Sequence, residues 1–232
     1  MNRRQFSQAS LFAMSSGALS LSGCRENSDA PPIALPPFSQ STFHSQLEAL
    51  RLAYEAKDQH VSSSLLPPLN ESVLRERCAW FPAALPEELI ALYAWHGGQD
   101  KEVDQDKFPF WFRDCGFISP SQAEREYKDI MSSYGQNPMD HELLKYSFPF
   151  AAFNSGWLVL PCKSQSLDPR FPRPVIFVME GITVFFYSMQ LMVDTCVEWV
   201  SHPQLNEHAQ LPSDIELKIW QKHNPRIFAD AR

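Results

Sequence analysis

Glycine is scarce in this sequence, with 8 among 232 residues, whereas proline occurs 19 times. So few glycines leave little room for the glycine-rich loops that cradle phosphate groups, and the prolines indicate many short elements joined by stiff turns. Basic residues are also in the minority, with 20 Lys and Arg against 27 Asp and Glu and a formal net charge of -7. This balance argues against binding to nucleic acid and favours a basic or uncharged partner.

The familiar signatures of catalytic and metal sites are missing. The sequence has no Gly-x-Ser-x-Gly elbow, His-Glu-x-x-His helix or phosphate loop. His96 could act as a general base, but its place on the apolar face of a predicted helix favours a half-buried structural histidine. His202 and His208 have no partners at zinc-ligand spacing. We therefore predict that the protein is not an enzyme and holds no metal or cofactor.

Apolar side chains are plentiful: 44% of residues are hydrophobic and 12% are aromatic. This composition excludes a chain that is disordered throughout and supplies one good core. Two small domains are possible, but a single domain is the simpler interpretation.

The first 23 residues are typical of a signal peptide. Their only charged side chains are Arg3 and Arg4, and a weakly apolar, Ser-rich run follows. This run is too short and polar for a permanent membrane span. Arg3 and Arg4 with Phe6 resemble the twin-arginine motif that directs folded proteins to the Tat pore, and the Sec route is the alternative.

The leader ends in a sequence that resembles a bacterial lipobox, Leu-Ser-Gly-Cys at positions 21–24. Cleavage between Gly23 and Cys24 would free the Cys24 thiol for lipidation, which anchors a protein to a membrane without spanning it. Arg25 stands where an inner-membrane retention signal would have Asp, so the outer membrane of a bacterial cell envelope is favoured, with the domain facing the periplasm. Residues 24–40 are polar and then proline-rich, which predicts an extended tether.

Four helices are predicted in the first half of the domain that we expect over residues 41–232. Asn70 can cap the second, Pro86 occupies the first position of the third, and Ser119 with Gln122 begins the fourth. The residues that mark their apolar faces are, in chain order, Phe43, Leu47, Leu50 and Tyr54; Leu74, Cys78 and Phe81; Leu89, Leu92, Tyr93 and His96; and Ala123, Tyr127, Ile130 and Tyr134.

Short apolar runs at 148–153, 156–160, 174–179 and 182–187 predict strands, with a tight hairpin turn at Glu180 and Gly181. Two further helices follow, one capped by Ser188 and one by a capping box of Ser213 and Glu216. Helices, a mostly antiparallel sheet and helices again make an α+β fold.

The order of these landmarks resembles the SUKH superfamily, which groups fungal Smi/Knr-type cell-wall-assembly regulators with bacterial toxin-immunity proteins. The matching segments are 85–98 (LPEELIALYAWHGG), 117–123 (FISPSQA), 148–153 followed by Gly156 and Trp157, and Tyr187 with Ser188 before a helix that ends in Trp199 and Val200. The resemblance spans about residues 69–202. The chain departs from it in its leader, in a proline-rich insert at 162–172 and in a C-terminal helical extension after His202.

The resemblance implies a single non-catalytic binding domain, in which helices pack on a twisted sheet and the partner surface varies between members. No family contact can therefore be carried over to this chain. The resemblance also implies that Leu85, Leu89 and Trp95 belong to the core, and that Gly97 and Gly98 end a helix and need backbone freedom.

Four cysteines remain once Cys24 is lipidated. Cys78 and Cys196 lie on apolar helical faces, which favours buried thiols. Cys115 and Cys162 are expected in loops, and they are the pair that we suspect of forming a disulfide in an oxidising compartment.

The loop at 97–111 is the expected partner-binding site, because recognition usually resides in loops on a rigid scaffold and aromatic residues anchor interfaces. Its candidate contacts are Gly98, Gln99, Asp100, Asp104, Asp106 and Trp111. Calcium binding by its three aspartates is disfavoured, since the EF-hand glycine and closing Glu are absent. An equally weighted alternative places Trp111 and Phe112 in the core as a strand, with the acids merely solvating the surface.

Two functions suit these features. The first is a membrane-anchored immunity protein that neutralises a toxin by direct protein-protein binding, and the acidic charge suits a basic toxin. The alternative is an envelope scaffold or cell-wall-assembly regulator that neutralises nothing. An adjacent toxin gene would favour the first.

Overall fold

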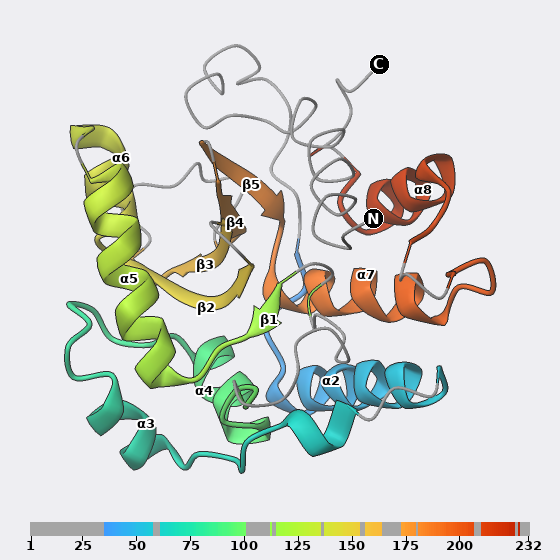
Figure 1. The fold of residues 1–232 in the computed structure, drawn as a ribbon, viewed down its shortest axis with the longest axis horizontal. Coiled ribbons are helices and arrows are strands. Elements are labelled where there is room, and N and C mark those ends of the chain that lie inside the picture. Colours follow the sequence, from blue (N-terminus) through green and yellow to red (C-terminus); the bar gives the residue numbers. More distant parts are fainter. Residues whose placement is uncertain are drawn as a thin grey trace, which may run out of the picture.

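The computed structural model describes residues 35–57, 61–100, 112, 115–135, 137–153, 156–163, 173–179, 181–206, 210–225 and 227 (Figure 1). Its helices and strands, in chain order, are α2 (Gln40–Glu55), the 3-10 helix η1 (Val61–Ser64), α3 (Glu71–Arg77), α4 (Glu87–Trp95), β1 (Gly116–Phe117), α5 (Pro120–Tyr134), α6 (Pro138–Leu144), β2 (Ser147–Phe153), β3 (Gly156–Pro161), β4 (Val175–Val178), β5 (Ile182–Phe186), α7 (Met189–Ser201) and α8 (Ser213–His223).

The five strands form one antiparallel sheet in which neighbours in the sequence are neighbours in space. Val178 pairs with Ile182, which makes β4 and β5 the predicted hairpin, although Glu180 itself lies outside the described residues. The β2–β3 register shifts between Pro149 and Ala151. A bulge is one of the places where a strand tolerates proline, which has no N–H to donate to the ladder. The predicted α+β fold with an antiparallel sheet is confirmed.

Helices cover both faces of the sheet. Because successive side chains of a strand point to opposite faces, Trp157 and Val159 join one apolar cluster while Leu158 and Leu160 join another. The smaller cluster includes residues of α5 and α6, and the larger one includes residues of α2, α4, α7 and α8. Figure 1 shows the same division, with α5 and α6 on one side of the sheet and α2 and α7 on the other.

Three predicted helix starts are confirmed. The Asn70 side chain accepts a hydrogen bond from the Val73 amide at the start of α3, and the Ser188 hydroxyl accepts one from the Leu191 amide at the start of α7. Ser119 and Gln122 form a full capping box before α5, with Pro120 as its first residue. Each side chain satisfies an amide that the helix itself leaves without a partner.

Other local predictions are wrong. Phe81 lies beyond the end of α3, although it is buried, and Pro86 precedes α4 at the N-cap position instead of opening the helix. Ser213 is the first residue of α8, after Pro212 at the cap, so the predicted capping box with Glu216 does not form. Three elements, η1, β1 and α6, were not predicted, because with four, two and seven residues they are too short for a clear periodicity.

The segments that flank the resemblance are part of the core. Leu35 and Phe38 pack against the large cluster, so packed structure begins before the predicted boundary at residue 41. At the other end, Trp220 of α8 is 1% exposed and donates an indole hydrogen bond to the Phe185 carbonyl at 3.3 Å. Asn224 accepts a hydrogen bond from the Tyr187 amide at 3.1 Å. The C-terminal extension is therefore integrated into the domain.

The predicted leader, lipobox and most of the tether lie outside the described residues. These include Arg3, Arg4, Phe6, Gly23 and Cys24. Within the part of the chain that the structure describes, no helix has both the length and the apolar character needed to cross a membrane.

Candidate functional site

The predicted binding loop is described at its first residues and just after its last. Gly98 is buried, Gln99 is half-buried and Asp100 is exposed. Asp104, Asp106 and Trp111 lie outside the described residues, so their role as partner contacts stays a prediction. What the structure adds is how the loop is fixed to the domain.

Gly98 has a backbone conformation and a position that only glycine suits. Its φ of +112° lies in the region that residues with a side chain rarely adopt. A Cβ atom there would also lie 2.6 Å from the Ser119 amide nitrogen and 2.7 Å from the Ser119 Cα. The need for backbone freedom after α4 is thus confirmed at Gly98, while α4 itself ends at Trp95 and His96 is its C-cap. Gly98 therefore has a structural role at the start of the loop.

The chain leaving α4 is hydrogen-bonded to the segment that follows η1. The Gly97 amide donates to the Leu66 carbonyl at 3.2 Å, and the Leu66 amide donates to the Gly98 carbonyl at 2.8 Å. The Asp100 amide donates to the Ser64 carbonyl at 2.8 Å. These bonds hold the start of the loop against η1.

Gln99 ties the same segment to the sheet. Its amide donates to the Phe117 carbonyl at 2.8 Å, and its side-chain Oε1 accepts a hydrogen bond from the Phe117 amide at 2.8 Å. The Gln99 side chain therefore acts as part of a strand pairing at β1. Among the loop residues that the structure describes, Asp100 is the one that is exposed.

The far end of the loop enters the core. Phe112 is 1% exposed, its ring lies edge-on to Phe150 with centroids 5.7 Å apart, and its backbone pairs with that of Cys115. The alternative that placed Phe112 in the core is therefore confirmed for that residue. The loop is therefore attached to the packed domain at both ends, by hydrogen bonds at residues 97–100 and by burial of Phe112.

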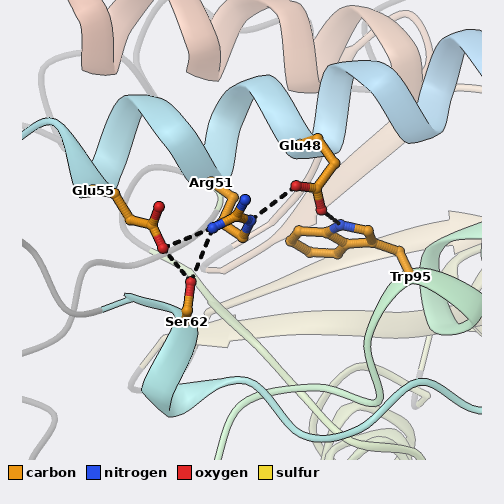
Figure 2. A network of polar contacts seen from close by, with 5 residues as sticks. All are labelled: Glu48, Arg51, Glu55, Ser62 and Trp95. Atoms are coloured by element: carbon orange, nitrogen blue, oxygen red, sulfur yellow. Dashed lines mark hydrogen bonds and ion pairs between the residues drawn. The ribbon is translucent and has the colours of Figure 1, made fainter.

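A network of polar side chains lies beside the start of the loop and joins α2, η1 and the end of α4 (Figure 2). The Trp95 indole Nε1 donates to Glu48 Oε1 at 2.5 Å, and Arg51 Nε donates to Glu48 Oε2 at 2.9 Å. Trp95 is 3% exposed, so its indole N–H requires a partner within the protein. Glu48 supplies it and links α4 to α2.

The network continues along α2 to η1. Arg51 Nη1 donates to Glu55 Oε1 at 2.7 Å and to the Ser62 hydroxyl at 3.1 Å, and that hydroxyl donates to the same Glu55 oxygen. Two carboxylates thus share one guanidinium, and the group keeps a net negative charge. Figure 2 shows Glu55, Arg51 and Glu48 following one another along α2, with Trp95 beside Glu48 and with Ser62 reaching Glu55 and Arg51 from η1 below.

The electrostatics of this network favour its charged form. Burial raises the pKa of Glu48, but the hydrogen bonds from Trp95 and Arg51 outweigh it and leave the pKa below its ordinary value. The hydrogen bond from Ser62 lowers the pKa of Glu55, and the bond to Glu48 raises the pKa of Arg51. The carboxylates are therefore ionised at neutral pH, which suits them to positioning and to attracting basic groups.

His96 is used by the fold. Its Nδ1 lies 3.0 Å from the Leu66 carbonyl oxygen, which can only accept, so Nδ1 carries the proton. Burial lowers the pKa of His96 and keeps the ring neutral near pH 7. Its ring also lies edge-on to Trp95, with centroids 4.6 Å apart. These contacts match the half-buried structural histidine that the sequence favoured.

The four described cysteines are thiols. The suspected bond between Cys115 and Cys162 is not formed: Cys115 is buried, and the Cys162 thiol donates to the Leu160 carbonyl at 3.3 Å. Burial raises the pKa values of Cys78 and Cys162 to about 12, which makes both thiols unreactive. Among the residues that the structure describes, no group of three or more His, Cys, Asp or Glu side chains is arranged to hold a metal ion.

The sequence contained one signal for the network that was overlooked. Glu48, Arg51 and Glu55 are spaced three and four residues apart, which places them on one helical face. Their contacts with Ser62 and Trp95 depend on how α2 meets η1 and α4, and no local pattern encodes that meeting.

No family model matches the chain, and no curated protein matches it. The arrangement itself is a loop held at both ends, beside an anionic network, on a helix-covered sheet.

Proposed function

We propose that this protein is a lipid-anchored binding module of the bacterial envelope that neutralises a toxin by direct protein-protein contact. The lipobox-like Cys24 and the SUKH-like landmarks motivate the proposal. The excess of acidic residues suits a basic partner. A periplasm-facing domain at the outer membrane suits a toxin that attacks peptidoglycan or membrane.

The observation that best supports this proposal is that both ends of the 97–111 loop are fixed to the domain. Backbone hydrogen bonds fix Gly98, Gln99 and Asp100 at one end, and the buried Phe112 fixes the other. Because residues 97–100 and 112 are already fixed, fewer residues lose conformational entropy on binding than in a loop whose flanking residues also had to be ordered. The ionised Glu48 and Glu55 add negative charge beside the start of the loop. This combination suits recognition of a basic surface.

Charge reversal in the loop provides the test. The double substitution Asp104→Lys and Asp106→Lys should weaken partner binding, mainly by slowing association in a salt-dependent way, because surface charges steer encounter more than they hold the complex. The thermal midpoint should stay nearly unchanged. The measurement is a pull-down from an envelope extract at low and high salt, with the wild type and this variant side by side.

A matched control reverses two exposed carboxylates elsewhere, Glu76→Lys on α3 and Asp129→Lys on α5. It changes the net charge by the same amount and should recover the partner as well as the wild type does. Equal recovery of a specific partner by all three proteins would remove the loop from the interface. Recovery of no partner, together with a hydrolytic activity of the purified protein, would overturn the binding function altogether.

A further inference from the structure

Two lysines converge on one tyrosine at the edge of the fold. Tyr146 follows α6 and precedes β2, and the Nζ atoms of Lys145 and Lys163 lie 5.2 Å and 3.4 Å from the centroid of its ring. Tyr146 is half-buried and Lys163 is exposed. Lys163 comes from the far end of β3, so the group unites two segments that are 18 positions apart in the sequence.

The backbone holds this group in place. The Cys162 amide donates to the Tyr146 carbonyl at 2.8 Å, which extends the β2–β3 pairing beyond Ser147 and Pro161. The Tyr127 hydroxyl donates to the Lys145 carbonyl at 3.0 Å. The backbone on either side of this group is thus fixed by the sheet and by α5, before any ligand is present.

Among the described residues, no carboxylate forms an ion pair with either lysine of this group. Lys128, Lys218 and Lys222 each pair with a carboxylate, namely Glu124, Asp214 and Glu198. Within the described ranges, neither Lys145 nor Lys163 pairs with one. Two like charges held near one another repel, and in a chain of net charge -7 such a pair stands out. An anion would relieve the repulsion.

Both lysines change the pKa of Tyr146. Lys163 first, and then Lys145, lowers the pKa of Tyr146 by favouring its ionised form. The two ammonium groups and the phenol ring thus lie close together at one place on the fold.

We propose that Lys145, Tyr146 and Lys163 form a binding site for a phosphate group, distinct from the 97–111 loop and independent of its function. Two ammonium point charges and a phenol hydroxyl offer more donors than the two oxygens of a carboxylate require, whereas a phosphate presents three or four oxygens. The phosphate belongs either to a soluble phosphate ester or to an anionic lipid headgroup.

The test uses the full chain carrying Cys24→Ala, so that no attached lipid contributes, and inorganic phosphate as the probe. Phosphate should bind saturably, and it should raise the pKa of Tyr146 in an absorbance titration against chloride at equal ionic strength. The Tyr146→Phe variant lacks this phenol, so the absorbance change that it loses belongs to Tyr146. Lys145→Gln with Lys163→Gln should weaken phosphate binding by roughly tenfold or more, the loss expected from charge-assisted hydrogen bonds.

Lys218→Gln is the control, because it removes the same charge from an exposed lysine that already has a carboxylate partner. It should leave phosphate affinity unchanged. Equal affinities for the wild type and the Lys145/Lys163 double variant, or a Tyr146 pKa that phosphate does not move, would overturn the proposal.

Vesicles distinguish the two sources of the phosphate. Binding to phosphatidylglycerol vesicles that the double variant loses, with none to phosphatidylcholine, assigns the site to an anionic headgroup. Phosphate binding without a difference on vesicles assigns it to soluble phosphate esters. Both results support the site, and neither depends on whether the loop binds a toxin.

Discussion

Replacing Cys24 with Ala is expected to move the protein from the membrane fraction to the soluble periplasmic fraction, or to leave it as an unprocessed precursor. The proposed anchor is a lipid on a single thiol, and no described helix can span the bilayer instead. Removing that thiol should therefore abolish salt-resistant membrane attachment. The measurement is fractionation of cells followed by high-salt washing of the membranes.

A suitable control is Cys162→Ala, which removes a half-buried thiol of the domain. It should remain with the membranes. Mature Cys24→Ala protein that stays tightly bound after the salt wash would contradict the lipoprotein interpretation, since another part of the chain would then hold the membrane.

The largest expected loss of stability comes from Trp220→Ala in α8. The Trp220 ring is 1% exposed and packs against Phe185 and Phe186, with centroids 5.2 Å and 4.9 Å apart. Truncating a buried tryptophan removes its apolar contacts and leaves a cavity, which costs about 3–5 kcal/mol. Urea unfolding followed by far-UV circular dichroism should show this loss in the free energy of unfolding.

Lys218→Ala lies on the same helix, with its side chain 74% exposed, and should change stability by less than about 0.5 kcal/mol. If Trp220→Ala destabilised the protein no more than this control, α8 would be an appendage and not part of the core. The packing of α8 against the ends of β5 and α7 predicts a clear difference between the two variants.

Much of the fold follows from local patterns in the sequence. Asn70, Ser119 and Ser188 were predicted as helix caps because each precedes an apolar helical face, and each makes that bond in the structure. Four of the strands were predicted from short apolar runs, and the β4–β5 hairpin from the tight turn at Glu180 and Gly181. These signals depend on a few neighbouring residues, so an isolated sequence carries them.

The errors arise where local patterns compete or are too short. Ser213 and Glu216 have the spacing of a capping box, but the cap position falls on Pro212, so Ser213 becomes part of α8. The pairing of Trp95 with Glu48 joins residues far apart in the chain. The convergence of Lys145 and Lys163 likewise depends on the β2–β3 register. Such contacts follow from the packing of elements and could not be predicted before the fold was known.

Crosslinking in living cells can show whether the 97–111 loop contacts a protein partner, as we propose. A photoreactive residue placed at position 104 should give one discrete adduct with another protein, while the same residue at position 218 on α8 should give none. An adduct from position 218 alone, or none from either position in cells that hold the toxin, would contradict this proposal.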